Sequence, residues 1–203
     1  VIPLSRWNVT EAANDLHGSA PEVAKRVRHG GFMSDAELFE NGFFSISAAE
    51  ASAMDPQQRQ LLERGYGAFH AAGMGKASLL GSVTAANVGQ WASEFGGVLA
   101  STPAGRGVFA STGASCSVTC GRVSFVLGLQ GPCASYDTAC SASLVANHGS
   151  LRSIQNLECG LALSAGVNMM FVSEVHLGSA TAGLTSAGGR SYMFDTRADG
   201  SAR

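Results

Sequence analysis

The sequence predicts an α/β fold, and three observations carry that prediction. Glycine occurs 26 times in 203 residues without a fixed period, which fits a chain with many tight turns. Residues 55–73 combine the start signals of a helix with apolar residues at helical spacing. Residues 161–167, LALSAGV, form an apolar run next to a glycine, as expected for a fully buried strand. We expect one domain or part of one, since no repeat, linker or low-complexity segment interrupts the chain.

Two adjacent helix starts precede the longest predicted helix. Ser47 and Glu50 have capping-box spacing, which predicts a short helix from Ser47 onward. Asp55 can cap a second helix, Pro56 suits its first position, and Gln58 can reach back to the cap. Gly73 is the predicted end of this scaffold helix. Its apolar face is predicted to consist of Leu61, Leu62, Tyr66 and Phe69.

The remaining elements follow from shorter patterns. Residues 1–28 are expected to be mostly irregular, and the end from Gly188 is expected to be a loop. The helix starting at 141 begins with small and apolar residues nearly all round, which predicts burial. In chain order we expect a weak strand over 81–88, a helix from Ser117 to Leu127, a strand over Cys133–Tyr136, a helix over Ser141–Ile154, and the strand 161–167 continuing over Met169–Val172 after a bend.

The composition describes a well-buried chain with nearly balanced charge. Hydrophobic residues make up 45% and charged residues 14%, and the formal net charge is −2. Because this charged fraction is low, we expect part of the surface to be hidden against further sequence or a partner. The densest basic cluster, Lys25, Arg26 and Arg28, is expected to be solvated, so no nucleic-acid partner is predicted. No apolar run is long enough to cross a bilayer.

The five cysteines indicate reduced thiols. They are Cys116, Cys120, Cys133, Cys140 and Cys159. Their number is odd and no secretory signal is visible, which favours an intracellular compartment. No pair has CxxC spacing, and the four-residue spacing of Cys116 and Cys120 has no matching His or Cys pair elsewhere. No metal site is therefore predicted.

Cys140 is the strongest candidate for a reactive side chain. It lies between a predicted strand and a predicted helix, and the small residues Ser141, Ala142 and Ser143 follow it. A thiol at a helix N-terminus faces unpaired N–H groups and the positive end of the dipole, which favour the thiolate. The same N–H groups can bind the oxyanion that forms when a thioester is attacked. A buried structural cysteine is the alternative, and the residues alone leave both interpretations open.

Other candidates have weaker support. Cys133 lies in a predicted strand with no helix after it, and Cys116, Cys120 and Cys159 are interpreted as packing residues. His148 is eight residues beyond Cys140 on one helix, roughly 12 Å away, and is interpreted as a helix residue that is packed or hydrogen-bonded. No GxSxG motif occurs, so a serine hydrolase is not supported. Residues 195–200 faintly resemble a calcium-binding loop, but Arg197 stands where an acidic ligand is needed, so no calcium site is predicted. No motif surrounds His17, His29, His70 or His176.

Several segments resemble one known family. Residues 137–143, DTACSAS, are similar to the DTACSSS active-site motif of modular (type I) polyketide ketosynthases, which are beta-ketoacyl synthases. The resemblance covers nearly the whole chain, and it points to the polyketide branch rather than to the related fatty-acid synthases. The other matching segments, in order, are Ile2–Trp7 (VPxxRW-like), GFFSISAAEASA at 42–53, MDPQQRQLLE at 54–63, GRVSFVLGLQGP at 121–132 and FDTRADG at 194–200.

The resemblance implies a fold and an activity. It implies the N-terminal half of a thiolase-like, five-layered α/β/α/β/α core, and a homodimer with the strand Cys133–Tyr136 near the two-fold axis. Cys140 would accept an acyl chain from the phosphopantetheine arm of an acyl carrier protein, with its own backbone N–H as one oxyanion donor. A malonyl-type thioester would then lose CO2 and attack in a decarboxylative Claisen condensation. No bound cofactor is expected.

The resemblance also implies that residues 1–203 are a partial domain. The family's first strand and C-terminal half, with two catalytic histidines and a lysine, are absent, so the fragment alone should accept an acyl group without completing condensation. Departures from the motifs are Cys120, Ala142 and the ending Ser201–Arg203. The alternatives are a truncated or degenerate ketosynthase acting in docking or dimerisation, a fatty-acid-type condensing enzyme, and one acting on coenzyme A esters. The expected location is the cytoplasm, or a plastid in a eukaryote.

Overall fold

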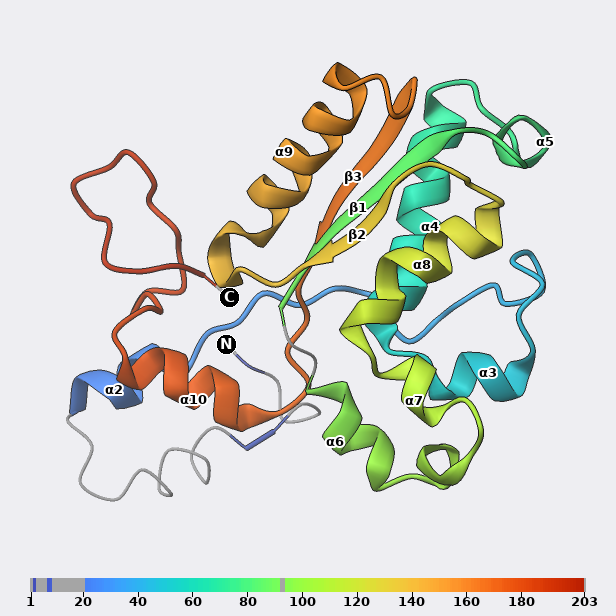
Figure 1. Cartoon of the computed structure of the whole chain (residues 1–203). Coiled ribbons are helices and arrows are strands. Elements are labelled where there is room, and N and C mark those ends of the chain that lie inside the picture. The colour runs from blue at the N-terminus through green and yellow to red at the C-terminus, as the bar shows by residue number, and fades with distance from the viewer. Residues whose placement is uncertain (1, 3–6, 9–20, 92–93, 203) are drawn as a thin grey trace. The chain divides into compact units, whose positions relative to one another are not determined.

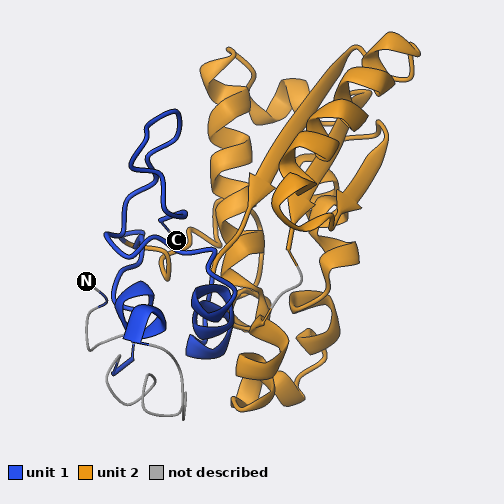
Figure 2. Cartoon of the chain, turned by 90° about the vertical axis from the view of Figure 1, so that its left-hand side faces the viewer, with its two compact units in different colours: residues 1–34, 170–203 blue, residues 35–169 orange. Residues whose placement is uncertain are grey.

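The computed structural model describes residues 2, 7–8, 21–91 and 94–202. The chain divides into two compact units, one formed by residues 1–34 with 170–203 and the other by residues 35–169 (Figure 2). His17 and most of the segment similar to VPxxRW lie outside the described residues. Unit 35–169 contains all five cysteines and the sheet.

The sheet of this unit has three parallel strands in the order β2-β1-β3. They are β1 (Thr84–Gln90), β2 (Cys133–Tyr136) and β3 (Leu161–Val167). The predicted bounds of β2 and β3 are confirmed, and β1 begins three residues later than the strand predicted over 81–88. The described residues 169–172 form no strand, so the predicted continuation is wrong. Because β1 is central, all seven of its residues are buried.

β3 is less buried than its sequence predicted. Only Leu163 is fully buried, whereas Ser164 and Gly166 are exposed. The prediction of a fully buried strand is wrong because β3 lies at the edge of the three-stranded sheet, a position that its composition does not reveal.

Helices cover the two faces of the sheet unequally. Figure 1 shows α4 (Pro56–Ala71) and α8 (Cys116–Leu127) on one face and α9 (Ala142–Gln155) on the other. The large apolar core lies on the α4 and α8 side and includes Leu61, Leu62, Phe69, Val88, Val123 and Leu127. Shorter helices complete the unit: α3 (Ala48–Ala53), α5 (Lys76–Leu79), α6 (Phe95–Ala100), η1 (Pro103–Arg106) and α7 (Ala110–Gly113).

The start of α4 confirms most of its sequence signal. The Asp55 carboxylate accepts a hydrogen bond from the backbone N–H of Gln57 at 2.8 Å, and Pro56 occupies the first turn. Gln58 does not reach back to the cap, and that prediction is wrong. Its buried amide instead donates to the carbonyl of Thr112 at 3.2 Å and accepts from Arg122 Nε at 2.8 Å, which ties α4 to α8. Gly73 ends the helix region with φ +80°.

The caps of α3 and α8 differ from the predictions in detail. Ser47 accepts a hydrogen bond from the Glu50 backbone N–H at 3.1 Å, as predicted. The Glu50 carboxylate pairs with Arg122 instead of closing the capping box. Helix α8 begins one residue before Ser117 with Ser115 at its N-cap, and the two serine hydroxyls hydrogen bond at 2.7 Å.

Helix α9 has almost the predicted bounds but not the predicted burial. Ala142 and Ala146 are buried against the sheet, whereas Leu144 is 69% exposed and Leu151 50% exposed. The prediction that the first turns are buried all round is therefore wrong. Only one stripe of α9 packs against the sheet, and the leucines face away from it.

The unit formed by residues 1–34 and 170–203 contains α2 (Pro21–Arg26) and α10 (Ser173–Thr181). The sequence did not single out α2 within residues 1–28, which were expected to be mostly irregular. The loop-like end of the chain is confirmed, since described residues 188–202 add only one isolated bridge, between Ser201 and Thr185. Arg26 is not simply solvated, because its guanidinium donates to the carbonyls of Thr185 and Asp199. Buried His176 contacts the Val27 carbonyl at 3.2 Å.

Candidate active site

Cys140 is exposed in a tight turn between β2 and α9. The turn is a 3-10 segment, η2 (Ala139–Ser141), and α9 begins with the next residue. Ala139 has φ +55°, a left-handed conformation that is uncommon for a residue with a Cβ. Ser141 holds the turn closed, because its hydroxyl donates to the Thr138 carbonyl at 2.8 Å and its backbone N–H to the same carbonyl at 3.3 Å. The strand, turn and helix predicted around Cys140 are all formed.

Two glycines let the first turn of α9 lie directly on the sheet. A Cβ at Gly89, near the end of β1, would lie 2.5 Å from the backbone nitrogen of Ser143. A Cβ at Gly166, near the end of β3, would lie 2.5 Å from the Cβ of Ser143. Only glycine permits this approach. The thiol-bearing turn therefore lies at the carboxyl ends of the parallel strands, the edge where open α/β sheets bind their ligands.

Cys116 is a weaker nucleophile candidate than its half-exposed position suggests. Burial is the main factor that raises the pKa of its thiol, and the nearby carboxylate of Asp137 raises it further. Both effects disfavour the thiolate. Its interpretation as a packing residue is consistent with this environment.

Cys133 is the second exposed cysteine, and its surroundings differ from those of Cys140. It lies on β2 facing α8, where a hydrogen bond with the Cys120 thiol, followed by burial, raises the pKa of Cys133. The same hydrogen bond, assisted by Ser135 and backbone N–H groups, lowers the pKa of Cys120 to about 6. The hydrogen bond thus favours the thiolate at Cys120, which is only 4% exposed, and disfavours it at Cys133.

The thiol pair was not predicted. Cys120 is buried, as the packing interpretation requires, but it also carries an environment that favours the thiolate. Nothing in the sequence indicates that Cys120 and Cys133 meet, because one lies on α8 and the other on β2. Cys159 is buried, as predicted.

The histidines that the structure describes give no partner for the candidate thiol. Among the described residues, no histidine hydrogen bonds to Cys140. His148 lies on α9 and is exposed, so it is not packed. His70 is exposed on α4. The described residues also contain no cluster of three or more metal-ligating side chains.

A parallel strand, a turn with an exposed thiol, and a helix that packs closely on two glycines of the sheet therefore make up the candidate site. The family model for the N-terminal domain of beta-ketoacyl synthases matches residues 1–203, and the chain belongs to that family. The thiolase-like fold expected from the sequence is confirmed.

Curated relatives and solved structures place the chain close to polyketide synthases. It is 39% identical, over its full length, to one component of the phenolphthiocerol/phthiocerol polyketide synthase of Mycobacterium tuberculosis, and it covers 13% of that relative. It is 44% identical, over 98% of its length, to the type I polyketide synthase Pks15/1 for phenolphthiocerol synthesis of Mycobacterium bovis, of which it covers 10%. The chain thus spans a small part of the curated relatives it matches.

The fold is also similar to that of solved ketosynthases. The ketosynthase from module 6 of the bacillaene synthase of Bacillus subtilis 168 superimposes with a TM-score of 0.83 at 32% identity, over 98% of this chain and 32% of that one. The predicted relationship to polyketide ketosynthases is confirmed by these matches. Within the described chain, no helix combines the length and apolar character needed to span a membrane.

Proposed function

We propose that this chain is the nucleophile-bearing part of a ketosynthase in a type I polyketide synthase, and that Cys140 accepts the growing acyl chain. The observation that carries the proposal is the exposed Cys140 in the η2 turn, within the DTACSAS motif and at the N-terminus of α9. Family membership and similarity to solved ketosynthases support the reaction class.

The first step is transthioesterification. The Cys140 thiolate attacks the carbonyl carbon of an acyl thioester carried on phosphopantetheine. The new C–S bond forms as the bond to the carrier sulfur breaks, and the carrier thiolate leaves and is then protonated. The backbone N–H of Cys140 would donate to the transient oxyanion, as donors near a helix N-terminus do.

The second step is decarboxylative condensation. A malonyl-type thioester loses CO2, and its resulting enolate carbon attacks the Cys140-bound acyl carbonyl. The C–C bond forms as the C–S bond to Cys140 breaks, which returns the thiolate. In the family that this sequence resembles, two histidines and a lysine assist this step, and their motifs do not occur within residues 1–203. We therefore assign the chain acyl acceptance, with condensation belonging to the full protein.

The partners follow from the same proposal. The acyl donor and the extender would both be presented by an acyl carrier protein, and no bound cofactor is required. A homodimer would form through β2, since β2 is an edge strand of the described sheet, with its outer edge unpaired by described residues. We also propose an intracellular location, where thiols such as the five in this chain stay reduced.

The exposed leucines of α9 support the view that residues 1–203 form part of a larger domain. Leu144 and Leu151 are seven residues apart and share one stripe of the helix. We propose that the second half of the fold covers this stripe in the full protein. A double substitution, Leu144→Lys with Leu151→Lys, should then destabilise the full-length protein through loss of that packing.

A labelling experiment tests the nucleophile assignment. Iodoacetamide at limiting concentration should modify Cys140 of the full-length protein first, because this thiol is exposed and is not engaged by a second cysteine. Cys133 should react slowly, since its thiol hydrogen bonds with Cys120. Peptide mapping identifies the modified residue, and Cys133→Ala is the matched control. Preferential labelling of Cys133 or Cys159, with Cys140 inert, would contradict the assignment.

A substrate assay separates ketosynthase activity from its alternatives. The full-length protein should extend an acyl group with malonyl-carrier protein and should use coenzyme A esters poorly. Preference for coenzyme A esters would identify a different condensing enzyme. An intact protein that binds carrier protein but forms no C–C bond would favour a docking or dimerising role.

A further inference from the structure

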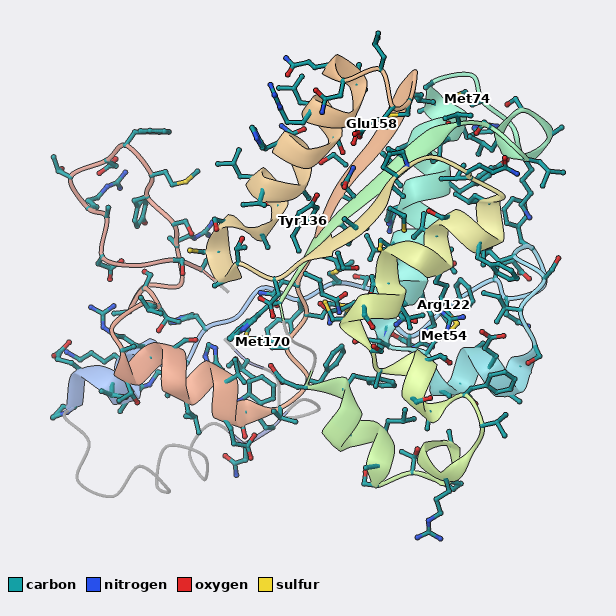
Figure 3. The ribbon with its side chains drawn as sticks, in the orientation of Figure 1. Met54, Met74, Arg122, Tyr136, Glu158 and Met170 are labelled. Atoms are coloured by element: carbon teal, nitrogen blue, oxygen red, sulfur yellow. The ribbon has the colours of Figure 1, made fainter. Side chains whose placement is uncertain are left out.

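Three polar side chains meet beneath α9, on the face of the sheet that this helix covers. Asn87 comes from the middle of β1, Tyr136 from the end of β2, and Ser150 from the second half of α9. We call these three residues the polar seam. Figure 3 shows Tyr136 between α9 and the strands. None of them belongs to a motif that supports the proposed function.

Asn87 connects the other two members. Its Nδ2 donates to Ser150 Oγ at 3.1 Å, and its Oδ1 accepts from the Tyr136 hydroxyl at 3.2 Å. The Ser150 hydroxyl in turn donates to the Leu163 carbonyl of β3 at 3.4 Å. Asn87 is 2% exposed and Ser150 4% exposed, so water contributes little at either side chain. Asn87 and Ser150 together therefore link all three strands to α9.

Two residues at the seam, its member Asn87 and the neighbouring Gly149, are disfavoured by their local structure. Asparagine is depleted in strands, yet Asn87 occupies the centre of β1. Gly149 lies inside α9, where glycine costs about 1 kcal/mol relative to alanine. A Cβ at Gly149 would overlap the Tyr136 hydroxyl and lie 3.1 Å from its Cζ, so the glycine makes room for the phenol. Departures from local preference of this kind concentrate at functional sites.

The hydrogen bonds of the seam fix the orientation of α9 on the sheet, which apolar packing alone does not. Apolar burial holds a helix on a sheet but is non-directional, whereas a satisfied polar network specifies one arrangement. Tyr136 is four residues before Cys140 and Ser150 is ten residues after it. Asn87 thus binds the chain on both sides of the thiol-bearing turn and fixes the end of β2 relative to the second half of α9.

We propose that Asn87 is a positioning residue for the reaction at Cys140, acting through Tyr136 and Ser150. This inference rests on the proposed function of Cys140. Asn87 touches neither the thiol nor the acyl group. Its effect is to hold the η2 turn in the orientation from which Cys140 and its backbone N–H meet the same thioester carbonyl.

The test replaces Asn87 by leucine, which has a similar size and no hydrogen-bonding group. In the full-length protein, Asn87→Leu should lower the rate constant for acylation of Cys140 at saturating N-acetylcysteamine thioester by about 10- to 100-fold, as expected for a displacement near 1 Å. The KM for the thioester should change little, because the substrate contacts remain. Val88→Ala is the matched control, since Val88 is the next residue of β1 and is buried in the opposite core. It should lower stability and leave the acylation rate of folded protein unchanged.

An apolar version of the seam separates positioning from stability. The triple variant Asn87→Leu, Tyr136→Phe, Ser150→Ala leaves no seam side chain with an unpaired polar group, so its melting temperature should recover relative to Asn87→Leu. Its acylation rate should stay low if directional bonds orient the turn. A triple variant that acylates at the wild-type rate would overturn the proposal.

A second readout keeps this inference distinct from the proposed function. Amide hydrogen exchange in Asn87→Leu should accelerate over residues 138–150 and stay unchanged in α4 and α8. Unchanged exchange over 138–150, or equal acceleration everywhere, would overturn the positioning role whatever the activity. If wild-type Cys140 is not acylated while the local exchange change is observed, the proposed function fails and the link between Asn87 and the turn stands.

Discussion

The two faces of β1 differ in what they contact. Ala86 and Val88 point into the large apolar core formed with α4 and α8. Asn87 and Gly89, which alternate with them, point to α9 and contribute an amide and a bare backbone. The first face buries apolar surface and the second brings a helix close in one orientation. We infer that the α4 and α8 face supplies most of the stability, while the α9 face places Cys140.

The largest effect is expected when a single methyl group is added to β1 on its α9 face. Gly89→Ala would put a Cβ 2.5 Å from the backbone nitrogen of Ser143, so the start of α9 must shift. We expect acylation of Cys140 to fall at least about 100-fold. Stopped assays with the N-acetylcysteamine thioester measure it.

Gly67→Ala is the matched control for that variant. Gly67 lies exposed within α4 and a Cβ there meets nothing within 4 Å, so this variant should gain about 0.5–1 kcal/mol of stability and keep its acylation rate. Equal acylation rates in Gly89→Ala and wild type would refute the close-approach argument.

A large-to-small substitution in the opposite core should lower stability and leave acylation unchanged. Leu62 is fully buried between α4 and its neighbours. Leu62→Ala should lower the free energy of unfolding by about 2–5 kcal/mol through lost burial and a cavity. Acylation per folded molecule, measured well below the melting temperature, should remain near wild type. A large loss of acylation in fully folded Leu62→Ala would show that the two faces are not separable.

The thiol pair on the α8 side of the sheet should make the stability of the fold depend on pH. The pKa of Cys120 is lowered to about 6, mainly by its hydrogen bond with Cys133. Since the folded pKa lies below the unfolded value of about 8.5, this group stabilises the fold fully above that value and loses the contribution as pH falls through about 6. The raised pKa of Cys133 acts in the opposite sense above about 8.5. Stability should therefore rise between about pH 6 and 8.5 and then decline.

Thiolate absorbance provides the measurement. The wild-type protein should show a thiolate that titrates near pH 6, and Cys120→Ala should lack it. The titration should persist in Cys140→Ala, because the pair lies on the α8 side of the sheet. Persistence of the step in Cys120→Ala would contradict the pairing.

The smallest expected effect concerns a helix cap far from the turn. Ser47 accepts one hydrogen bond from the Glu50 backbone, and Ser47→Ala should cost about 1 kcal/mol. Thermal unfolding measures it, with Ser52→Ala as an exposed control in the same helix. A loss above about 3 kcal/mol would indicate that the cap does more than close one helix end.

Local signals in the sequence predicted much of this structure. The Asp55 cap, the first-turn Pro56 and the bounds of β2 and β3 depend on nearby residues, and they were predicted correctly. The strand–turn–helix placement of Cys140 was likewise available from small residues after a short apolar run. The edge position of β3 was not, because it depends on strand order.

The features that surround the thiol depend on contacts between distant segments. Gly89 and Gly166 lie on two strands yet accommodate the same residue of α9. Asn87 meets partners 49 and 63 residues away. Cys120 and Cys133 meet only because α8 packs on β2. No periodicity or motif encodes such encounters, so the sequence located the nucleophile candidate but not the residues that hold it.

The most direct test of the account is the site of acylation. The full-length protein is incubated with an N-acetylcysteamine acyl thioester, digested and mapped by mass spectrometry. We predict one acyl group on the peptide containing Cys140, none in Cys140→Ala, and normal acylation in Cys133→Ala. An acyl group on Cys133 or on another residue, with Cys140 unmodified in the folded wild-type protein, would contradict the central claim.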